Sequence, residues 1–149
     1  ACGPKGMVEG QSRDLDAEGK KIKLEELDEI HNLKTGKLIQ ACVESICILK
    51  KDLPNQHLRA FKNFAKKFGL AFQIKDDILD VIGDEKVIGK PIKSDLKLKK
   101  ASYPSIIGLE ASQERAEKLC AEALAILTKL PYKTDNLIKL SKFILINLN

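Results

Sequence analysis

The segment from residue 55 to residue 82 constrains the fold of this chain more than any other. Pro54 stands just before it, and proline is well suited to the start of a helix. Apolar residues then recur at helical spacing until the segment is apolar almost all round. These positions are Leu58, Phe61, Phe64, Ala65, Phe68, Ala71, Phe72, Ile78, Leu79 and Ile82. A helix of this kind belongs in the middle of a helical bundle, so we expect an all-α fold.

Three aspartates interrupt the apolar end of this segment. On a helix, Asp76 and Asp80 are i,i+4 neighbours, and Asp77 and Asp80 are i,i+3 neighbours. Gln73 lies one turn earlier on the same strip. Clustered carboxylates repel one another unless a cation lies among them, and oxygen ligands on a rigid element suit Mg²⁺. The pattern predicts either a magnesium site or an ordinary solvated acidic face.

The rest of the chain is also predicted to be helical, because we find apolar residues at helical spacing and no strand alternation. We expect helices over roughly 24–49, 113–130 and 137–148, a short helix over 103–108, and a helix within 1–18. Ser112 is expected to cap the helix that begins at residue 113. The spacing of Gly3, Gly6 and Gly10 would let another helix approach closely if that segment is helical. Residues 1–149 are expected to belong to one domain.

Two further stretches carry side chains suited to an anion. Lys34 and Thr35 stand beside a helix-weakening glycine within the predicted 24–49 helix, a pattern that by itself usually means solvent exposure. The stretch from 83 to 103 is the least regular part of the chain, and it carries Lys90 and Lys100. A loop of this composition after an acidic helix could fold over a bound anion or be an ordinary surface loop.

Charge and cysteine content restrict the class of partner and the compartment. The formal net charge is +5, which suits a phosphate-bearing partner, but the lysines are scattered and form no nucleic-acid-binding arm. The four cysteines have no C-x-x-C spacing, which favours buried thiols in a reducing compartment. No apolar run approaches the roughly 20 residues of a membrane span, and no signal peptide is apparent. We therefore expect a cytoplasmic protein that binds neither nucleic acid nor membrane.

Taken together, five motifs resemble the trans-prenyl diphosphate synthases. They are Gly6-Met7 with Gly10-Gln11 and Asp14 to Lys20, Ile30-His31 with Lys34-Thr35-Gly36, Phe72 to Asp80, Gly89-Lys90-Pro91, and Ser94-Asp95 to Lys100 with Tyr103-Pro104. They follow the family's order and spacing, and the likeness is strongest to the bacterial members that make farnesyl diphosphate. The resemblance implies a partial isoprenoid synthase (trans-prenyltransferase) fold, an all-α bundle around a deep cavity.

The resemblance also implies the reaction. Members of the family condense an allylic diphosphate, such as dimethylallyl or geranyl diphosphate, with isopentenyl diphosphate, and the product here would be farnesyl diphosphate. By analogy, Asp76, Asp77 and Asp80 would hold Mg²⁺ against the allylic diphosphate. Thr35 and Gln73 would turn their oxygen dipoles toward the developing allylic cation.

The remaining roles implied by the resemblance concern the diphosphate and the cavity wall. Lys34 and Lys90 would contact the allylic diphosphate directly, and Lys100 would close over it. Gln11 and Asp14 would line the cavity nearby. These residue types agree with the chemistry, because breaking the carbon–oxygen bond leaves an anion that metal and lysines stabilise.

The family's first aspartate-rich motif has no match in this chain, which corresponds to roughly the second half of a family member. Half a metal site should not catalyse the reaction, so activity is expected of a full-length protein, which would form a homodimer. Alternatives are a non-catalytic helical domain that binds a partner or a prenyl diphosphate, and one subunit of a two-chain synthase. Lys75, beside Asp76, would weaken metal binding if it points inward.

Overall fold

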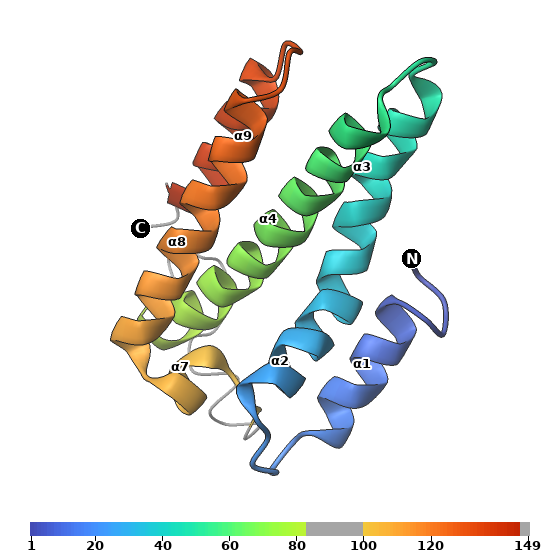
Figure 1. The fold of residues 1–149 in the computed structure, drawn as a ribbon. Coiled ribbons are helices and arrows are strands. Elements are labelled where there is room, and N and C mark those ends of the chain that lie inside the picture. Colours follow the sequence, from blue (N-terminus) through green and yellow to red (C-terminus); the bar gives the residue numbers. More distant parts are fainter. Residues whose placement is uncertain (83–99, 147–149) are drawn as a thin grey trace.

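The regular structure of the chain is helical throughout the residues that the structure describes, which are 1–82 and 100–146 of this computed structural model (Figure 1). The elements are α1 (Met7–Asp16), α2 (Leu24–His31), the π-helical turn η1 (Asn32–Gly36), α3 (Lys37–Leu49), α4 (Asn55–Ile82), α7 (Tyr103–Ile107), α8 (Leu109–Thr128) and α9 (Asp135–Ile146). The predicted all-α class is confirmed.

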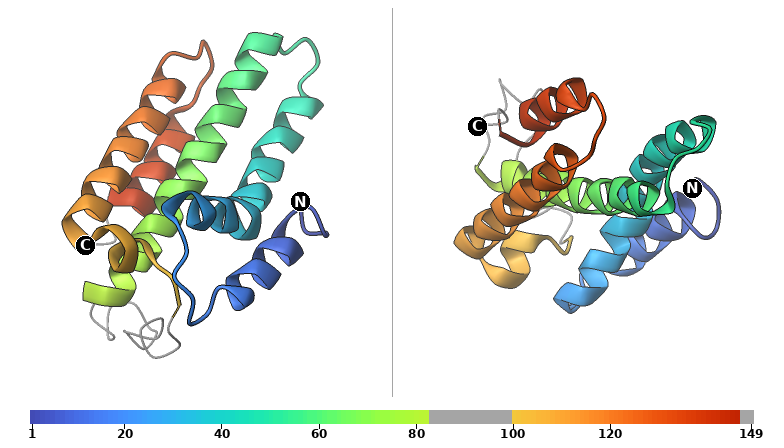
Figure 2. Two further views of the ribbon diagram at one scale, coloured as in Figure 1. Left: turned by 60° about the horizontal axis from the view of Figure 1, so that its bottom comes forward. Right: turned by 45° about the horizontal axis from the view of Figure 1, so that its top comes forward.

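Helix α4 lies in the middle of the bundle, as its all-round apolar sequence predicts. It packs against α8 on one side and α3 on the other, and α9 returns alongside α8 (Figures 1 and 2). Phe64, Ile74 and Ile78 of α4 are buried. Full burial of each such side chain contributes about 1.5–3 kcal/mol. The helix begins at Asn55 and ends at Ile82, so both predicted ends are confirmed.

An apolar cluster holds the end of α4 that carries the aspartates. Its fully or nearly fully buried members are Leu27, Ile74, Ile78, Tyr103 and Ala116, which come from α2, α4, α7 and α8. Ile74 and Ile78 alternate along α4 with the aspartates, so the packed core and the polar residues share the same two turns of helix. The positions of the aspartates are therefore fixed by apolar packing.

The predicted 24–49 helix is continuous but contains a change of helix type. α2 leads into η1, whose five residues Asn32–Gly36 form a π-helical turn, and η1 leads into α3. A π-helical turn inserts an extra residue into an α-helix and is frequent at functional sites. Lys34, Thr35 and Gly36 all fall within this turn.

Two glycines allow neighbouring helices to approach η1 closely. A Cβ atom on Gly10 of α1 would lie 2.2 Å from the backbone nitrogen of Lys34. A Cβ atom on Gly69 of α4 would lie 3.2 Å from the Cα atom of Gly36. The close approach predicted from the N-terminal glycines is confirmed at Gly10. A Cβ atom on Gly3, by contrast, would have no neighbouring atom within 4 Å.

The apolar face expected along the whole 24–49 helix is only partly buried beyond η1, where Val43 of α3 packs against the core. Leu27 and Ile30 are buried, but Ile46 is 68% exposed and Leu49 is 78% exposed. The extra residue in the π turn rotates α3 relative to α2, so positions that share a face in a uniform α-helix do not share one here. Within the described residues, this side of α3 is uncovered.

The C-terminal helices begin earlier than their sequence pattern predicts. Gly108 has φ +85°, a conformation that favours glycine, and it separates α7 from α8. Helix α8 starts directly after it at Leu109, so the prediction that Ser112 caps a helix beginning at residue 113 is wrong. The Ser112 hydroxyl lies inside α8 and donates a hydrogen bond to the carbonyl oxygen of Gly108 at 2.6 Å.

The cysteines are free thiols in two different environments. Cys47 and Cys120 are buried, and burial raises the pKa of both thiols, which keeps them protonated and unreactive. Cys2 and Cys42 are exposed, so the expectation of four buried thiols is wrong for these two. None of the helices within the described ranges has the length and apolar character needed to cross a membrane.

Candidate active site

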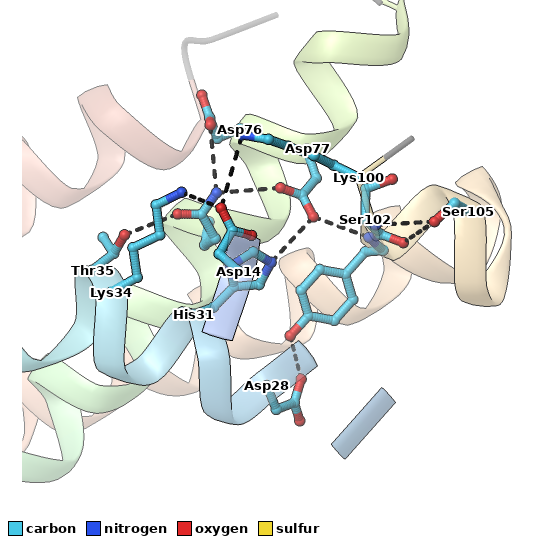
Figure 3. Close-up of polar contacts among 12 residues, drawn as sticks. Asp14, Asp28, His31, Lys34, Thr35, Asp76, Asp77, Lys100, Ser102 and Ser105 are labelled. Carbon is cyan, nitrogen blue, oxygen red and sulfur yellow. Dashed lines mark hydrogen bonds and ion pairs between the residues drawn. The ribbon is translucent and has the colours of Figure 1, made fainter. Parts of the chain in front are cut away.

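The polar residues of η1 face the aspartate-rich end of α4 (Figure 3). The Thr35 hydroxyl donates a hydrogen bond to Gln73 Oε1 at 3.0 Å. At its other end, the Gln73 amide donates from Nε2 to Asp77 Oδ1 at 3.2 Å and to Asp76 Oδ2 at 3.4 Å. The structure thus brings four of the predicted site residues into one chain of hydrogen bonds.

A second group of predicted residues meets on the α1 side of the site. Asp14 of α1 is buried, and its Oδ2 atom lies 2.7 Å from Lys34 Nζ and 3.8 Å from Lys100 Nζ (Figure 3). One carboxylate therefore stands between two ammonium groups. The excess positive charge makes this corner of the site suitable for an anion.

The Asp77 carboxylate points away from this corner, toward α2 and α7 (Figure 3). Its Oδ2 atom accepts a hydrogen bond from the backbone N–H of Tyr103 at 3.0 Å and lies 3.3 Å from His31 Nε2. The His31 ring stacks on the Tyr103 ring with centroids 5.6 Å apart. Asp77, His31 and Tyr103 are all buried.

Behind Tyr103 lies a further ion pair. The Tyr103 hydroxyl donates to Asp28 Oδ1, Arg115 Nη2 lies 2.5 Å from Asp28 Oδ2, and the Arg115 guanidinium stands 5.7 Å from the centre of the Tyr103 ring. Burial, with the Asp28 hydrogen bond, raises the pKa of the Tyr103 hydroxyl far above its ordinary value. Tyr103 therefore stays neutral and serves as a hydrogen-bond donor.

Sequence reasoning gave no individual role to Asp28, His31, Tyr103 or Arg115, although His31 and Tyr103 belong to the motifs that carry the family resemblance. One signal was available on α2, because Asp28 and His31 are i,i+3 neighbours and therefore lie on one face of that helix. Arg115 is more than 80 positions further along the chain. No local pattern predicts its pairing with Asp28.

Three of the predicted site residues lie outside these two groups. Gln11 is exposed on α1. Asp80 is buried one turn after Asp76 on α4. Lys90 lies outside the described residues.

The carboxylates suit a magnesium ion that is shared with a ligand. No group of three or more histidine, cysteine, aspartate or glutamate side chains gathers around a possible ion within residues 1–82 and 100–146. Mg²⁺ commonly takes only one or two carboxylates and completes its shell with water and phosphate oxygens. Asp76, with Asp80 one turn further along the same strip, fits that requirement. The sequence-based assignment of all three aspartates to the metal stays a prediction.

Lys75 lies next to Asp76 in sequence but one turn after Ala71 on α4. Ala71 packs with Cys120, which is a residue of α8. The Asp77 carboxylate, by contrast, contacts α2 and α7. Consecutive residues of an α-helix point about 100° apart, so Lys75 is on the side of α4 that faces α8.

The fold and this arrangement of side chains define a class, the all-α trans-prenyltransferases. A geranyltransferase from Helicobacter pylori, complexed with magnesium and isoprenyl diphosphate, superposes with a TM-score of 0.78 at 33% identity, over 96% of this chain and 46% of that chain. A geranyltransferase from Legionella pneumophila gives a TM-score of 0.78 at 31% identity, over 99% of this chain and 46% of that one. These neighbours have the isoprenoid synthase fold.

The chain belongs to the polyprenyl synthetase family, whose model matches residues 4–139. It is 39% identical to the farnesyl diphosphate synthase of Bacillus subtilis over 144 residues, which are 97% of this chain and 48% of that protein. It is 43% identical to a geranylgeranyl diphosphate synthase of Cyanophora paradoxa over 140 residues, 93% of this chain and 46% of that protein. The chain thus spans about half the length of these relatives.

Proposed function

We propose that the full-length protein is a Mg²⁺-dependent farnesyl diphosphate synthase. It joins an allylic diphosphate, dimethylallyl or geranyl, to isopentenyl diphosphate. The observation that carries the proposal is the π-helical turn η1, which sets Lys34 and Thr35 opposite Gln73 and Asp76 of α4. Support for farnesyl diphosphate as product comes from relatives such as the farnesyl diphosphate synthases of Bacillus subtilis and Escherichia coli, the latter 42% identical over 130 residues.

The chemistry begins when the carbon–oxygen bond of the allylic diphosphate breaks, which leaves a diphosphate anion and an allylic cation. Lys34 and Lys100 receive the anion; before it binds, Asp14 balances their charge. Lys90 joins them in this role. Asp76, Asp77 and Asp80 are the proposed metal-binding residues, and Mg²⁺ would supply charge stabilisation for the departing diphosphate.

Thr35 and Gln73 act on the cationic side of the reaction. Because the Thr35 hydroxyl donates its hydrogen to Gln73 Oε1, the lone pairs of Thr35 Oγ1 remain available to face positive charge. Oxygen dipoles that are already oriented stabilise a developing charge without reorganisation during the reaction. Gln11 and Asp14 belong to the cavity wall beside them.

The wider assembly is also part of the proposal. Residues 1–149 form the C-terminal part of a single all-helical domain, and the full-length protein is a cytoplasmic homodimer. This chain alone is inactive, since the resemblance implies a second aspartate-rich helix that its sequence lacks. The uncovered apolar side chains of α3, including Ile46 and Leu49, are consistent with further helices packing there.

Product analysis of the full-length protein tests the proposal. The protein is incubated with isopentenyl diphosphate, Mg²⁺ and either dimethylallyl or geranyl diphosphate, and the products are dephosphorylated and separated by chain length. Farnesol is the expected alcohol from both substrates. A longer alcohol would assign another chain length. Binding of diphosphate without any turnover, even after mixing with other synthase subunits of the same cell, would instead identify a non-catalytic binding domain.

Replacing Thr35 with valine is expected to lower kcat about fivefold with little change in KM. Valine keeps the shape of threonine but removes the hydroxyl, and one hydrogen-bonding group is worth about 1 kcal/mol. Steady-state kinetics of the full-length protein with geranyl diphosphate would measure the effect. Thr35→Ser should keep most of the activity, and Thr128→Val, at an exposed position of α8, should change nothing. Equal activity of Thr35→Val and the unaltered protein would remove Thr35 from the mechanism.

A further inference from the structure

The acceptor oxygens of Asp77 are already occupied by groups of the protein. Oδ1 accepts from Gln73 Nε2 at 3.2 Å, and Oδ2 accepts from the backbone N–H of Tyr103 at 3.0 Å. His31 Nε2 lies 3.3 Å from the same Oδ2 atom. Asp77 is only 4% exposed. A carboxylate oxygen can accept more than one bond, but both oxygens already have a protein partner and almost none of the side chain is exposed, so a metal ion has little access to it.

His31 is buried without a hydrogen bond of its own. The residue is 5% exposed, and neither ring nitrogen has a hydrogen-bond partner within the described part of the chain. A buried polar group of this kind is costly and calls for an explanation. Its ring stacks on the Tyr103 ring with an angle of 22° between the ring planes. Its Nε2 atom points at the Asp77 carboxylate (Figure 3). The residue is therefore placed to hold these two partners.

The Gln73 amide depends on the same carboxylate. Its two ends differ, since Nε2 only donates and Oε1 only accepts hydrogen bonds. With Nε2 turned to Asp77 and Asp76, Oε1 is left to accept from Thr35. Without an acceptor at Asp77, the amide loses a main determinant of its orientation.

We propose that Asp77, together with His31 and Tyr103, positions the site rather than binding its metal. Asp77 holds the Gln73 amide on one side and the first residue of α7 on the other, and His31 supports both partners of that contact. The proposal deepens the proposed function and rests on it for the roles of Gln73 and Thr35. This refines the assignment of Asp76, Asp77 and Asp80 made above, because Asp76 and Asp80 remain the proposed metal-binding residues and Asp77 does not.

Two readouts on the full-length protein separate the roles of the neighbouring aspartates. One is the affinity for Mn²⁺ in the presence of inorganic diphosphate, measured by calorimetry. The other is hydrogen exchange of the Tyr103 amide, which reports opening of its hydrogen bond to Asp77. For Asp77→Asn we expect Mn²⁺ affinity within about threefold of the unaltered protein and Tyr103 exchange at least about tenfold faster. Asparagine has only one acceptor oxygen for two donors, Gln73 Nε2 and the Tyr103 N–H, and it lacks the charge that strengthens both bonds. Asp76→Asn should show the reverse pattern.

The opposite result would overturn the proposal. If Asp77→Asn weakens Mn²⁺ binding as much as Asp76→Asn does, and Tyr103 exchange is unchanged, Asp77 is a metal ligand. If the unaltered protein does not bind Mn²⁺ with diphosphate, the proposed function fails. Tyr103 exchange in Asp77→Asn then still decides whether Asp77 holds the backbone of Tyr103.

His31→Gln provides an independent test, also if Asp77→Asn does not fold. It should speed Tyr103 exchange and lower kcat several-fold while KM for geranyl diphosphate stays unchanged. His57→Gln is the matched control, because His57 also packs against a tyrosine, Tyr132, with Nδ1 at 2.7 Å from its hydroxyl and ring centroids 5.3 Å apart. The control should alter neither readout. Unchanged Tyr103 exchange in His31→Gln would contradict the role given to His31.

Discussion

Replacing Asp76 with asparagine in the full-length protein is expected to lower kcat by about 10²–10³-fold, the range found when one preorganised electrostatic group is removed from an active site. Asparagine keeps the size of aspartate but removes the charge that binds a divalent cation. The fold should be largely unaffected, because Asp76 is only half-buried and asparagine fills the same volume. Steady-state kinetics at several Mg²⁺ concentrations would measure the change.

Asp16→Asn is the matched control for this substitution. Asp16 is an exposed aspartate at the end of α1, so the same change of charge occurs away from the site. Its kcat and its Mg²⁺ requirement should equal those of the unaltered protein. The metal assignment would be abandoned if Asp76→Asn showed the same unchanged behaviour, or if extra Mg²⁺ had no influence on the defect.

Replacing Gly10 with alanine is expected to destabilise the protein and to weaken diphosphate binding at least about tenfold. A glycine-to-alanine change inside a helix ordinarily stabilises by about 0.5–1 kcal/mol. Here the new Cβ would lie 2.2 Å from the backbone nitrogen of Lys34, so α1 and η1 must move apart. Overpacking of this kind costs about 1–3 kcal/mol or more. The same movement separates Lys34 from Asp14 and changes where the ammonium group lies.

Thermal unfolding and calorimetry with Mg²⁺ and inorganic diphosphate would measure both effects. Gly3→Ala should leave them unchanged, because nothing lies within 4 Å of that position. The losses of stability and of diphosphate binding in Gly69→Ala should be intermediate between those of Gly3→Ala and Gly10→Ala, since its Cβ would approach Gly36 Cα at 3.2 Å. A Gly10→Ala protein as stable as the unaltered one would show that α1 does not need this close approach.

Much of this architecture was predictable because it follows from local periodicity. The position of α4 in the middle of the bundle was predicted correctly, since a helix that is apolar almost all round must be covered on all sides. Thr35, Gln73 and Asp76 were predicted as site residues and lie together. They were identified through a resemblance of motifs, since spacing alone does not bring residue 35 to residue 73.

The rest depended on tertiary contacts that no local pattern encodes. Residues 32–36 are compatible with an α-helix, and their π form goes with the close packing of Gly10 and Gly69 on either side. Ser112 has the composition of a helix cap, but the backbone turn at Gly108 starts α8 earlier. The contacts of Asp77 with α2 and α7 likewise appear only when distant segments meet.

The π-helical turn also links the direction of the reactive side chains Lys34 and Thr35 to the buried contacts of α2. An α-helix rotates by about 100° per residue, so deleting one residue from η1 would turn α2 by that angle relative to α3. Asp28 and His31 would then leave Tyr103 and Asp77, at the same time as Lys34 and Thr35 lost their facing residues. Chain length in this turn is therefore not free to vary as it is in a surface loop. Any functional homologue that altered it would have to rebuild both the reactive face and the buried contacts behind it in one step.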